Sequence, residues 1–366
     1  MRLSDFDYAL PPSLIAQYPL ENRDASRMLL LDRDAETDED RMFVEFSSVL
    51  RGDELVVVNN ARVIPARLLG RRVQKNSSRA TDEKHLTAKE AEIEILLSRR
   101  LQDSDTWEAL VRPGRKMHVG HRVQFGDGDL EAEVIGHTAR GQRTLRFSSL
   151  DGKAVIDHIQ NLGHIPLPPY IERADEPSDQ ERYQTVFASR PGAIAAPTAG
   201  LHFTPAVLKH IRERGVEICE LTLQVGLGTF QPIRSETLES HRMHSEEYEI
   251  GIETVERIIR AKDSGRRILA VGTTTVRALE SAALRAKDSG SAQLLAAGSA
   301  AAHLFIMPGF QFRVVDALLT NFHLPRSTLL ALVSAFAGCE RILAAYRHAV
   351  QAGYRFYSYG DCMLIR

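Results

Sequence analysis

Small hydroxyl residues, glycines and histidines follow apolar segments at three places in the chain. The apolar run Ala193–Ala196 leads into Thr198–His202, and Arg267–Val271 leads into Gly272–Thr275. The segment Asn321–Thr328 forms a third junction of this kind. Each pattern predicts a strand, a tight loop and the start of a helix, where backbone N–H groups point at a ligand in α/β proteins. We expect the active centre where these loops converge.

Capping residues support the predicted helix starts. Thr204 is a predicted N-cap, with Pro205 at the first helical position and Gly215 beyond the last turn. At the third junction Pro325 suits the first helical turn, and Ser327 or Thr328 can accept from free N–H groups. His202, His323 and Arg326 lie in these loops and could contact a ligand, although pure capping explains the third junction equally well.

Two further segments carry polar groups whose function remains open on sequence alone. Gly226-Leu-Gly228-Thr229 follows a predicted strand but lacks the rest of a dinucleotide fingerprint, so it predicts close approach to a ligand or to another chain segment. His241-Arg-Met-His244-Ser-Glu246-Glu247 concentrates titratable groups that could transfer protons, recognise substrate or serve only the structure. Its spacing matches no established zinc motif, and we expect no metal. Asp361 lies in a predicted tight turn, where aspartate is usually structural.

Basic residues form two clusters without acids. The first includes Arg62 and Arg67 within Ala61–Val73, and the second runs from Arg112 through Arg115 and Lys116 to Arg122. Such clusters suit a phosphate backbone, and a solvated surface is the alternative.

The composition bounds the class of protein. A chain of 366 residues with 43% hydrophobic and 26% charged residues predicts a soluble globular protein of two domains. No apolar run is long enough to span a bilayer, and no signal-peptide core is present at the start. Three cysteines without a CxxC pair favour a reducing cytoplasm. The net charge of −2 decides nothing about nucleic acid.

The hydrophobic pattern changes from helical periodicity to strand alternation at about Arg62, and it changes back at about Leu150. Short alternating strands are predicted between these points, over residues 92–97, 106–111, 121–125, 130–135 and 143–147. They predict a small antiparallel β-barrel (residues 63–150) inserted into an α/β domain (residues 1–62 and 151–366). Helices are expected over 154–162, 205–214, 253–264, 275–287, 325–337 and 340–352. Further strands are expected over 53–58, 217–225, 268–271, 314–320, 354–357 and 362–365. Residues 32–41 and 74–90 are predicted loops.

Missing motifs narrow the chemistry. The chain has no Walker A sequence, no GxSxG and no glycine-rich dinucleotide loop, which argues against a classical kinase, serine hydrolase or dehydrogenase.

Taken together, the motifs resemble the S-adenosylmethionine:tRNA ribosyltransferase-isomerase family of queuosine biosynthesis. The resemblance extends from end to end of the chain. It rests on residues 6–12, 59–67, 163–171, 181–187, 196–203, 225–230, 243–247, 272–277, 320–328 and 359–363.

The resemblance implies transfer and isomerisation of the ribosyl part of S-adenosylmethionine onto 7-aminomethyl-7-deazaguanine at the tRNA wobble position, which gives epoxyqueuosine and releases adenine and methionine. No metal or redox cofactor is implied, and we expect a cytoplasmic monomer. Candidate catalytic residues are His202, His244, Glu246 and Asp361. Candidate substrate-binding residues are Thr198, Gly200, Gly226, Gly228, Thr229, Thr273, Thr274, Arg277, His323 and Arg326. Candidate tRNA-binding residues are Arg62, Arg67, Arg115 and Lys116.

Two other functions fit part of the pattern. A phosphoribosyltransferase-like enzyme would use Gly272–Thr275 as a phosphate loop, but the preceding strand supplies no acidic pair. A non-catalytic tRNA-binding module would use the basic clusters and would leave the His- and Thr-bearing loops without a task.

Overall fold

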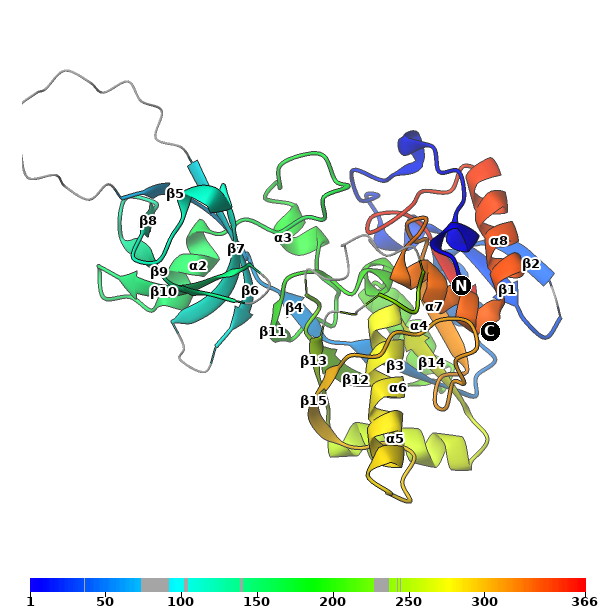
Figure 1. Ribbon diagram of the computed structural model, residues 1–366. Coiled ribbons are helices and arrows are strands. Elements are labelled where there is room, and N and C mark those ends of the chain that lie inside the picture. The colour runs from blue at the N-terminus through cyan, green and yellow to red at the C-terminus, as the bar shows by residue number, and fades with distance from the viewer. Residues whose placement is uncertain are drawn as a thin grey trace, which may run out of the picture. The chain divides into compact units, whose positions relative to one another are not determined.

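Contacts within the chain divide it into two compact units. The computed structural model describes residues 1–35, 37–73, 92–101, 105–138, 141–226, 237–241, 243 and 245–366 (Figure 1). The α/β unit comprises Met1–Arg62, Pro168–Ala174 and Glu181–Arg366, and the barrel unit comprises Val63–Leu167 and Asp175–Gln180. The barrel unit thus continues past Leu150, the predicted end of the insertion.

A nine-stranded sheet forms the centre of the α/β unit, in the order β15-β13-β12-β3-β14-β16-β17-β1-β2. Its inner strands β12, β3, β14 and β16 are parallel, and β1 runs parallel to β17. The other neighbours are antiparallel. The strands are β1 (Arg27–Asp32), β2 (Thr37–Met42), β3 (Glu54–Asn59), β12 (Glu217–Leu223), β13 (Glu246–Ile250), β14 (Arg267–Val271), β15 (Gly298–Ala302), β16 (Ala317–Asn321) and β17 (Cys362–Ile365).

Both faces of this sheet are covered, because successive side chains of a strand point to opposite sides. Leu55 and Val57 of β3 join the core beneath the larger helices, whereas Val56 and Val58 join the core on the other face. The first face is covered by α5 (Ile252–Asp263), α6 (Thr273–Asp288), α7 (Thr328–Ala337) and α8 (Cys339–Gln351), and the second by α1 (Phe46–Val49) and α4 (Pro205–Glu213). Burial on both faces explains why these strands are apolar runs without alternation.

A closed barrel of six antiparallel strands forms the barrel unit, in the order β10-β7-β6-β5-β8-β9. Alternation places Ile93, Ile95 and Leu97 inside. The strands are β5 (Arg67–Arg72), β6 (Glu92–Arg100), β7 (Thr106–Arg112), β8 (Arg122–Phe125), β9 (Leu130–His137) and β10 (Arg143–Ser149). The other strands and α-helices of the described residues are β4 (Ala61–Val63), β11 (Arg190–Ala193), α2 (Val155–Leu162) and α3 (Asp179–Arg182). The predicted fold class, an α/β domain with a small antiparallel barrel, is confirmed.

Four local predictions are wrong. The apolar run Ala193–Ala196 was expected to be a strand, but strand β11 ends at Ala193 and pairs with β4, outside the nine-stranded sheet. Residues 32–41 were expected to form a loop, but Thr37–Met42 is the edge strand β2, paired with β1. Its six residues are all exposed, so no apolar alternation marked it. Residues 354–357 form no strand beyond a single bridge between Phe356 and Ile15. Helix α7 begins at Thr328 rather than Pro325, because Ser327 is the N-cap and accepts from Leu330 N–H.

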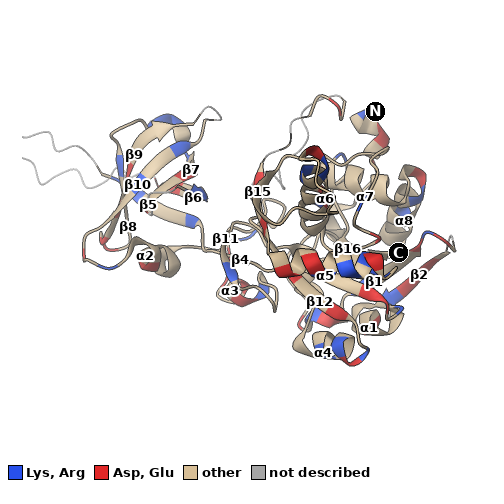
Figure 2. Cartoon of the chain, turned by 90° about the horizontal axis from the view of Figure 1, so that it is seen from below, with Lys and Arg blue, Asp and Glu red and all other residues tan. Residues whose placement is uncertain are grey.

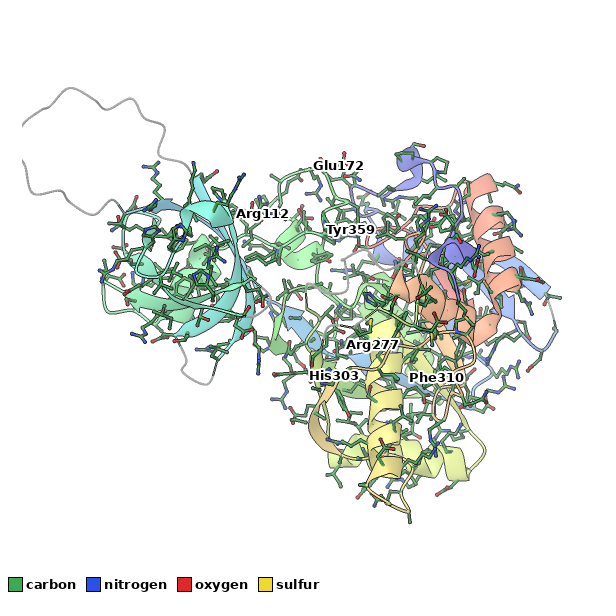
Figure 3. All side chains as sticks on the ribbon, viewed as in Figure 1. Arg112, Glu172, Arg277, His303, Phe310 and Tyr359 are labelled. Atoms are coloured by element: carbon green, nitrogen blue, oxygen red, sulfur yellow. The ribbon has the colours of Figure 1, made fainter. Side chains whose placement is uncertain are left out.

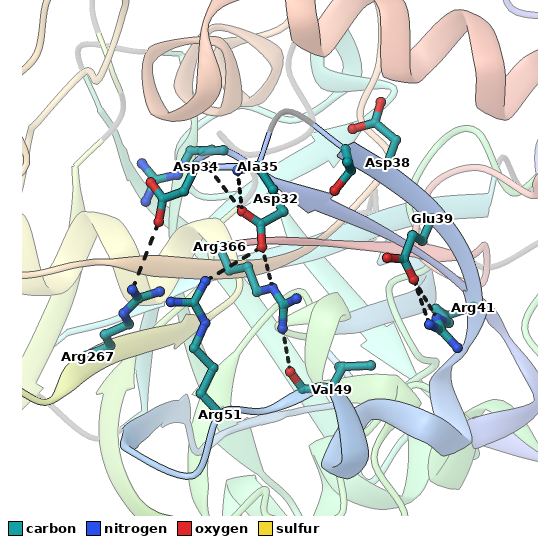
Figure 4. A network of polar contacts seen from close by, with 12 residues as sticks. Asp32, Asp34, Ala35, Asp38, Glu39, Arg41, Val49, Arg51, Arg267 and Arg366 are labelled. Carbon is teal, nitrogen blue, oxygen red and sulfur yellow. Dashed lines mark hydrogen bonds and ion pairs between the residues drawn. The ribbon is translucent and has the colours of Figure 1, made fainter.

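The turn between β1 and β2 is held by Asp32 (Figure 4). One carboxylate oxygen accepts from Ala35 and Asp34 N–H, and the other accepts from Arg366 Nε at 3.1 Å. These hydrogen bonds, led by that from Ala35, lower the pKa of Asp32. The last residue of the chain is thereby tied to the end of β1.

No single helix among the described residues is long and apolar enough to cross a bilayer; α7 and α8 meet that criterion only as a pair bent by 114°.

Candidate active site

A pocket opens where the inner strands of the α/β unit end. It has about 650 Å³ of open space, with the solvent at its mouth included. Among the described residues its lining carries no Asp, Glu, Lys or Arg, and we call it the uncharged pocket. Its lining residues are Tyr170, Ala196, Pro197, Thr198, Ala199, Val225, Gly272, Thr273, Thr274, Thr320, Asn321, Phe322, His323, Leu324, Ser327, Leu329, Tyr357 and Ser358. Residues from all three predicted junctions therefore meet in one pocket.

The start of α6 forms one wall of the uncharged pocket. Gly272 precedes the helix with φ +90°, a conformation that a residue with a side chain rarely adopts, and this lets the chain turn directly from β14 into α6. The first N–H groups of a helix have no partner within it. Thr275 Oγ1 donates back to Val271 O, but Thr274 Oγ1 is buried without a hydrogen-bond partner among the described residues. This wall offers donors and a hydroxyl to a ligand.

Asn321, at the end of β16, brings a buried amide to the same pocket. Its Nδ2 lies near three acceptors: Tyr357 O at 3.0 Å, Asp361 O at 3.4 Å and His202 Nε2 at 3.3 Å. Because the two carbonyl oxygens can only accept, they fix which end of the amide is nitrogen. Asn321 Oδ1 is then a buried acceptor without a partner among the described residues. Such an atom is costly to leave unpaired, which favours a ligand that donates to it.

His202 is buried next to Asn321, with 4% of its surface exposed. Since Asn321 Nδ2 donates to Nε2, the proton of the neutral ring is on Nδ1 and is donated to Ser26 Oγ at 2.6 Å. Ser26 Oγ donates in turn to Arg23 O. Burial, and then the charges of Arg23 and Arg355, lower the pKa of His202 to about 3. The ring is therefore neutral at neutral pH and lies in a directed chain of hydrogen bonds.

His323 lines the uncharged pocket itself. Its Nε2 is 2.8 Å from Thr320 Oγ1, and its backbone N–H donates to Tyr346 Oη. Burial lowers the pKa of His323 to about 3, so this ring also is uncharged at neutral pH. Neither predicted histidine is placed as a cation for an anionic group.

Glu246 and Arg277 pair with each other instead of facing the uncharged pocket. Arg277, on α6 (Figure 3), forms a buried ion pair with Glu246 of β13 and donates to Leu304 O. The other oxygen of Glu246 accepts from Gly226 N–H at 3.1 Å. Arg277 was expected to bind substrate, but its charge is matched inside the protein by Glu246. These contacts favour a role in holding the chain at Gly226.

Asp361 and Arg326 also have partners within the protein. The two carboxylate oxygens of Asp361 accept from Arg27 and Arg355 N–H, and Arg27 Nε lies 3.5 Å away. This arrangement favours the structural role of a turn aspartate over proton transfer. Arg326 is exposed, has φ +56° and pairs with Asp7 at 2.5 Å; it does not line the uncharged pocket.

Gly200 is a packing residue. A Cβ there would lie 2.7 Å from both the Phe187 ring and Thr185 Cγ2, so the close approach requires glycine. Gly228, Thr229 and His244 lie outside the described residues.

The predicted tRNA-binding residues differ in how their charges are matched. Arg62 is exposed, as are Arg115 and Lys116 in the turn after β7. Arg67 lies 3.5 Å from Glu94 on the neighbouring strand, and Arg122 pairs with Glu131 and Glu133. Figure 2 shows basic and acidic positions together on the barrel. A segment that contains no acidic residue can therefore still lie beside the acidic residues of neighbouring strands.

Sequence reasoning missed Asn321, Ser26, Arg23 and Arg182 as candidate residues. Asn321 stands two residues before His323 in the third junction, and its position at the end of an apolar strand was an available signal. Ser26 and Arg23 precede β1, which was not predicted.

No group of three or more His, Cys, Asp or Glu within the described part of the chain is arranged to hold a metal ion.

A pocket at the carboxyl ends of parallel strands is the usual ligand site of α/β enzymes.

Comparison with known proteins defines the family. The model of the family described as "Queuosine biosynthesis protein" matches residues 3–365. The chain is 49% identical to the S-adenosylmethionine:tRNA ribosyltransferase-isomerases of Moorella thermoacetica and Solibacter usitatus, over 100% of each chain. A crystal structure of S-adenosylmethionine tRNA ribosyltransferase from Thermotoga maritima is 38% identical, with a TM-score of 0.53, and the match covers 99% of this chain and 100% of that one. The chain therefore belongs to the queuosine biosynthesis protein family, as the motifs predicted.

Proposed function

We propose that this chain is an S-adenosylmethionine:tRNA ribosyltransferase-isomerase. In this reaction the ribosyl part of S-adenosylmethionine is moved onto the aminomethyl group of 7-aminomethyl-7-deazaguanine at the tRNA wobble position. Epoxyqueuosine forms, and adenine and methionine are released. Full-length identity of 49% to enzymes of that name supports the assignment. The structural observation that carries it is a pocket with two unpaired buried polar atoms where the predicted substrate loops meet.

S-adenosylmethionine is proposed to bind in the uncharged pocket. The N-terminus of α6, with Thr273 and Thr274, suits the carboxylate of the methionyl group. Tyr170, Phe322 and Tyr357 supply aromatic surface for adenine and for the sulfonium cation. Asn321 Oδ1 would accept from a ribose hydroxyl or from the incoming amine. The hydrogen-bond donors, the acceptor and the aromatic surface of this lining thus match the carboxylate, the hydroxyl or amine, and the adenine and sulfonium groups in turn.

The protein is proposed to act chiefly by positioning. A sulfonium already activates its adjacent carbon and leaves as a neutral thioether, so the reaction needs little added electrophilic assistance. His323 is the only histidine among the described lining residues, and its lowered pKa makes it a weak base. Burial raises the pKa of Tyr170 and of Tyr357, so neither phenol is an anionic base at neutral pH. The aminomethyl group of the tRNA nucleobase can then accept the proton itself, while the pocket holds the reacting atoms in line. His244 stays a prediction for proton transfer.

The test uses S-adenosylmethionine labelled in its ribose and tRNA that carries the aminomethyl base. Label is expected to enter the tRNA while adenine and methionine appear in equal amounts, with tRNA lacking the aminomethyl group as the control. Excess chelator is expected to leave the rate unchanged. Absence of label transfer would refute the proposed function, and loss of transfer that added metal restores would refute the metal-free mechanism.

The oligomeric state and the cellular location of the chain are proposed as well. We propose that the chain acts as a monomer in the cytoplasm. Light scattering of the purified protein at micromolar concentration should give a mass near 40.8 kDa. A mass of twice that value would contradict the monomer.

A further inference from the structure

A second pocket of the α/β unit lies next to the first and differs from it in charge. It has about 300 Å³ of open space, with its mouth included. We call it the arginine pocket. It is lined by Pro19, Leu20, Arg23, Ser26, Arg182, Leu201, His202, Ser358, Tyr359 and Gly360. Ser358 lines both pockets, and Asn321 of the first contacts His202 of the second.

The two arginines of this pocket donate only to backbone carbonyls. Arg23 donates to Leu201 O at 3.2 Å and to Glu181 O at 2.8 Å. Arg182 donates to Glu21 O at 2.9 Å and to Leu20 O at 2.6 Å, and its Nε is buried without a partner among the described residues. These bonds hold each guanidinium in place but do not neutralise it.

A third arginine adds positive charge close by. Arg355 donates to Tyr18 O, and its Nη1 is buried without a partner among the described residues. No described carboxylate lies within ion-pair distance of the Arg23, Arg182 or Arg355 side chains. Other arginines of this unit, such as Arg266, Arg277 and Arg341, do have such a partner. Asp361 is the acid nearest to Arg355 in the sequence, and it pairs with Arg27. Partly buried guanidinium groups that repel one another are stabilised by an anion.

We propose that the arginine pocket binds a backbone phosphate of the tRNA, next to the nucleotide that reacts in the uncharged pocket. This proposal rests on the proposed function. A guanidinium fork matches the oxygens of a phosphate, and such contacts fix the register of a nucleic acid. The carboxylate of S-adenosylmethionine is the competing anion, but the N-terminus of α6 already offers it a site in the uncharged pocket. The proximity of the two pockets would hold the wobble base over the sulfonium substrate.

The first experiment measures binding of the full-length chain to a fluorescent anticodon stem-loop with the aminomethyl base, across a series of salt concentrations. Arg182→Gln and Arg23→Gln are each expected to lower the slope of log affinity against log salt by about 0.7–0.9. Arg182→Lys should keep the slope and lose affinity severalfold, because it keeps the charge without the fork. Arg285→Gln is the matched control, since Arg285 also donates only to backbone carbonyls and also has a buried unpaired Nε, but lines neither pocket.

The second experiment changes the stem-loop, so its first part uses the wild-type chain and is independent of any effect of a substitution on folding. Single phosphates of the stem-loop are replaced in turn by neutral methylphosphonates. One position beside the reacting nucleotide should weaken binding most, and Arg182→Gln should add little further loss at that position. If the affinity losses from Arg182→Gln and from the methylphosphonate are strictly additive at every position, the proposal is overturned.

Binding of labelled S-adenosylmethionine separates the remaining outcomes. Unchanged affinity in the Gln variants supports a phosphate site. Weakened S-adenosylmethionine binding with normal stem-loop binding would assign the pocket to the carboxylate and overturn the proposal. If the wild-type chain transfers label and the variants bind the stem-loop with the wild-type slope, this proposal fails while the proposed function stands. If the wild-type chain transfers no label, it is the proposed function that fails.

Discussion

The two pockets of the α/β unit adjoin each other and yet hold opposite kinds of chemistry. The uncharged pocket offers hydroxyls, an amide oxygen and aromatic surface, whereas the arginine pocket offers guanidinium groups without acids. A pocket without charge selects its ligand by shape and by unpaired donors and acceptors, so its affinity depends weakly on salt. A cationic pocket selects by charge, and its affinity falls as salt rises. With the proposed assignments, small-molecule binding and tRNA binding can be altered separately in one unit.

Removing the unpaired polar atoms of the uncharged pocket should have the largest effect. Asn321→Leu and Thr274→Val are each expected to lower kcat/KM for S-adenosylmethionine by about 10²-fold, because a buried contact to the reacting substrate is lost. The salt slope of tRNA binding should not change. Steady-state kinetics at saturating tRNA measures the effect.

Ser281→Ala is the control for that prediction. Ser281 is on the same helix as Thr274 and its hydroxyl is also buried without a partner among the described residues, but it lines neither pocket. Activity of this variant should match the wild type. Equal losses in Thr274→Val and Ser281→Ala would mean that the helix, not the pocket, is sensitive.

The two buried histidines should make the free energy of unfolding depend on pH. The pKa of each is about 3 in the folded chain, below the value of about 6.5 in the unfolded chain. The unfolded state therefore binds more protons between these values, and this stabilisation is complete above about pH 6.5 and is lost as the pH falls. Between pH 7 and pH 5, each histidine should remove up to about 2 kcal/mol.

Urea unfolding at the two pH values of His202→Gln and His323→Gln checks this expectation. Each variant should show a smaller loss of stability than the wild type. The bound stem-loop should reduce the pH-dependent loss of stability that comes from His202, because a phosphate in the arginine pocket would stabilise its protonated ring. It should not change the loss that comes from His323, because only His202 faces that pocket. A pH dependence identical to that of the wild type in both variants would contradict the buried neutral rings.

The cations of the barrel unit should contribute less than those of the arginine pocket. Arg115→Gln and Lys116→Gln are each expected to lower the salt slope of tRNA binding by less than about 0.7, with little effect on S-adenosylmethionine binding. Arg67→Gln should lower it less, because Glu94 already matches its charge. A larger effect at Arg67 than at Arg115 would reverse this ranking.

The smallest effect is expected from separating the barrel unit. A fragment spanning residues 63–180 should fold alone as a β-rich unit and bind the stem-loop weakly. Circular dichroism and fluorescence anisotropy measure both properties. A helical spectrum would refute independent folding.

The elements that position the site could largely be predicted from the sequence, because their signals are local. Thr204 accepts from Val207 N–H as the N-cap of α4, and Gly215 has a positive φ after its last turn, both as predicted. The apolar run before Gly272 is β14, and α6 begins within two residues of the prediction. Periodicity failed where burial did not vary, as in the fully exposed strand β2.

The roles of charged residues could not be predicted in the same way. Whether Arg277 faces a ligand or Glu246 depends on β13, which comes 31 residues earlier in the chain. Arg67 meets Glu94 only through the register of β5 with β6. Pairings between distant residues decide which charges remain available, and no local pattern records them.

The chain of hydrogen bonds from Asn321 through His202 and Ser26 to the backbone of Arg23 has a thermodynamic consequence. Its two ends belong to different pockets, and each group has one orientation that satisfies its neighbours. If a ligand at one end favours that orientation, it reduces the ordering left for the ligand at the other end. Such a linkage is reciprocal: the factor by which tRNA tightens S-adenosylmethionine must equal the factor by which S-adenosylmethionine tightens tRNA.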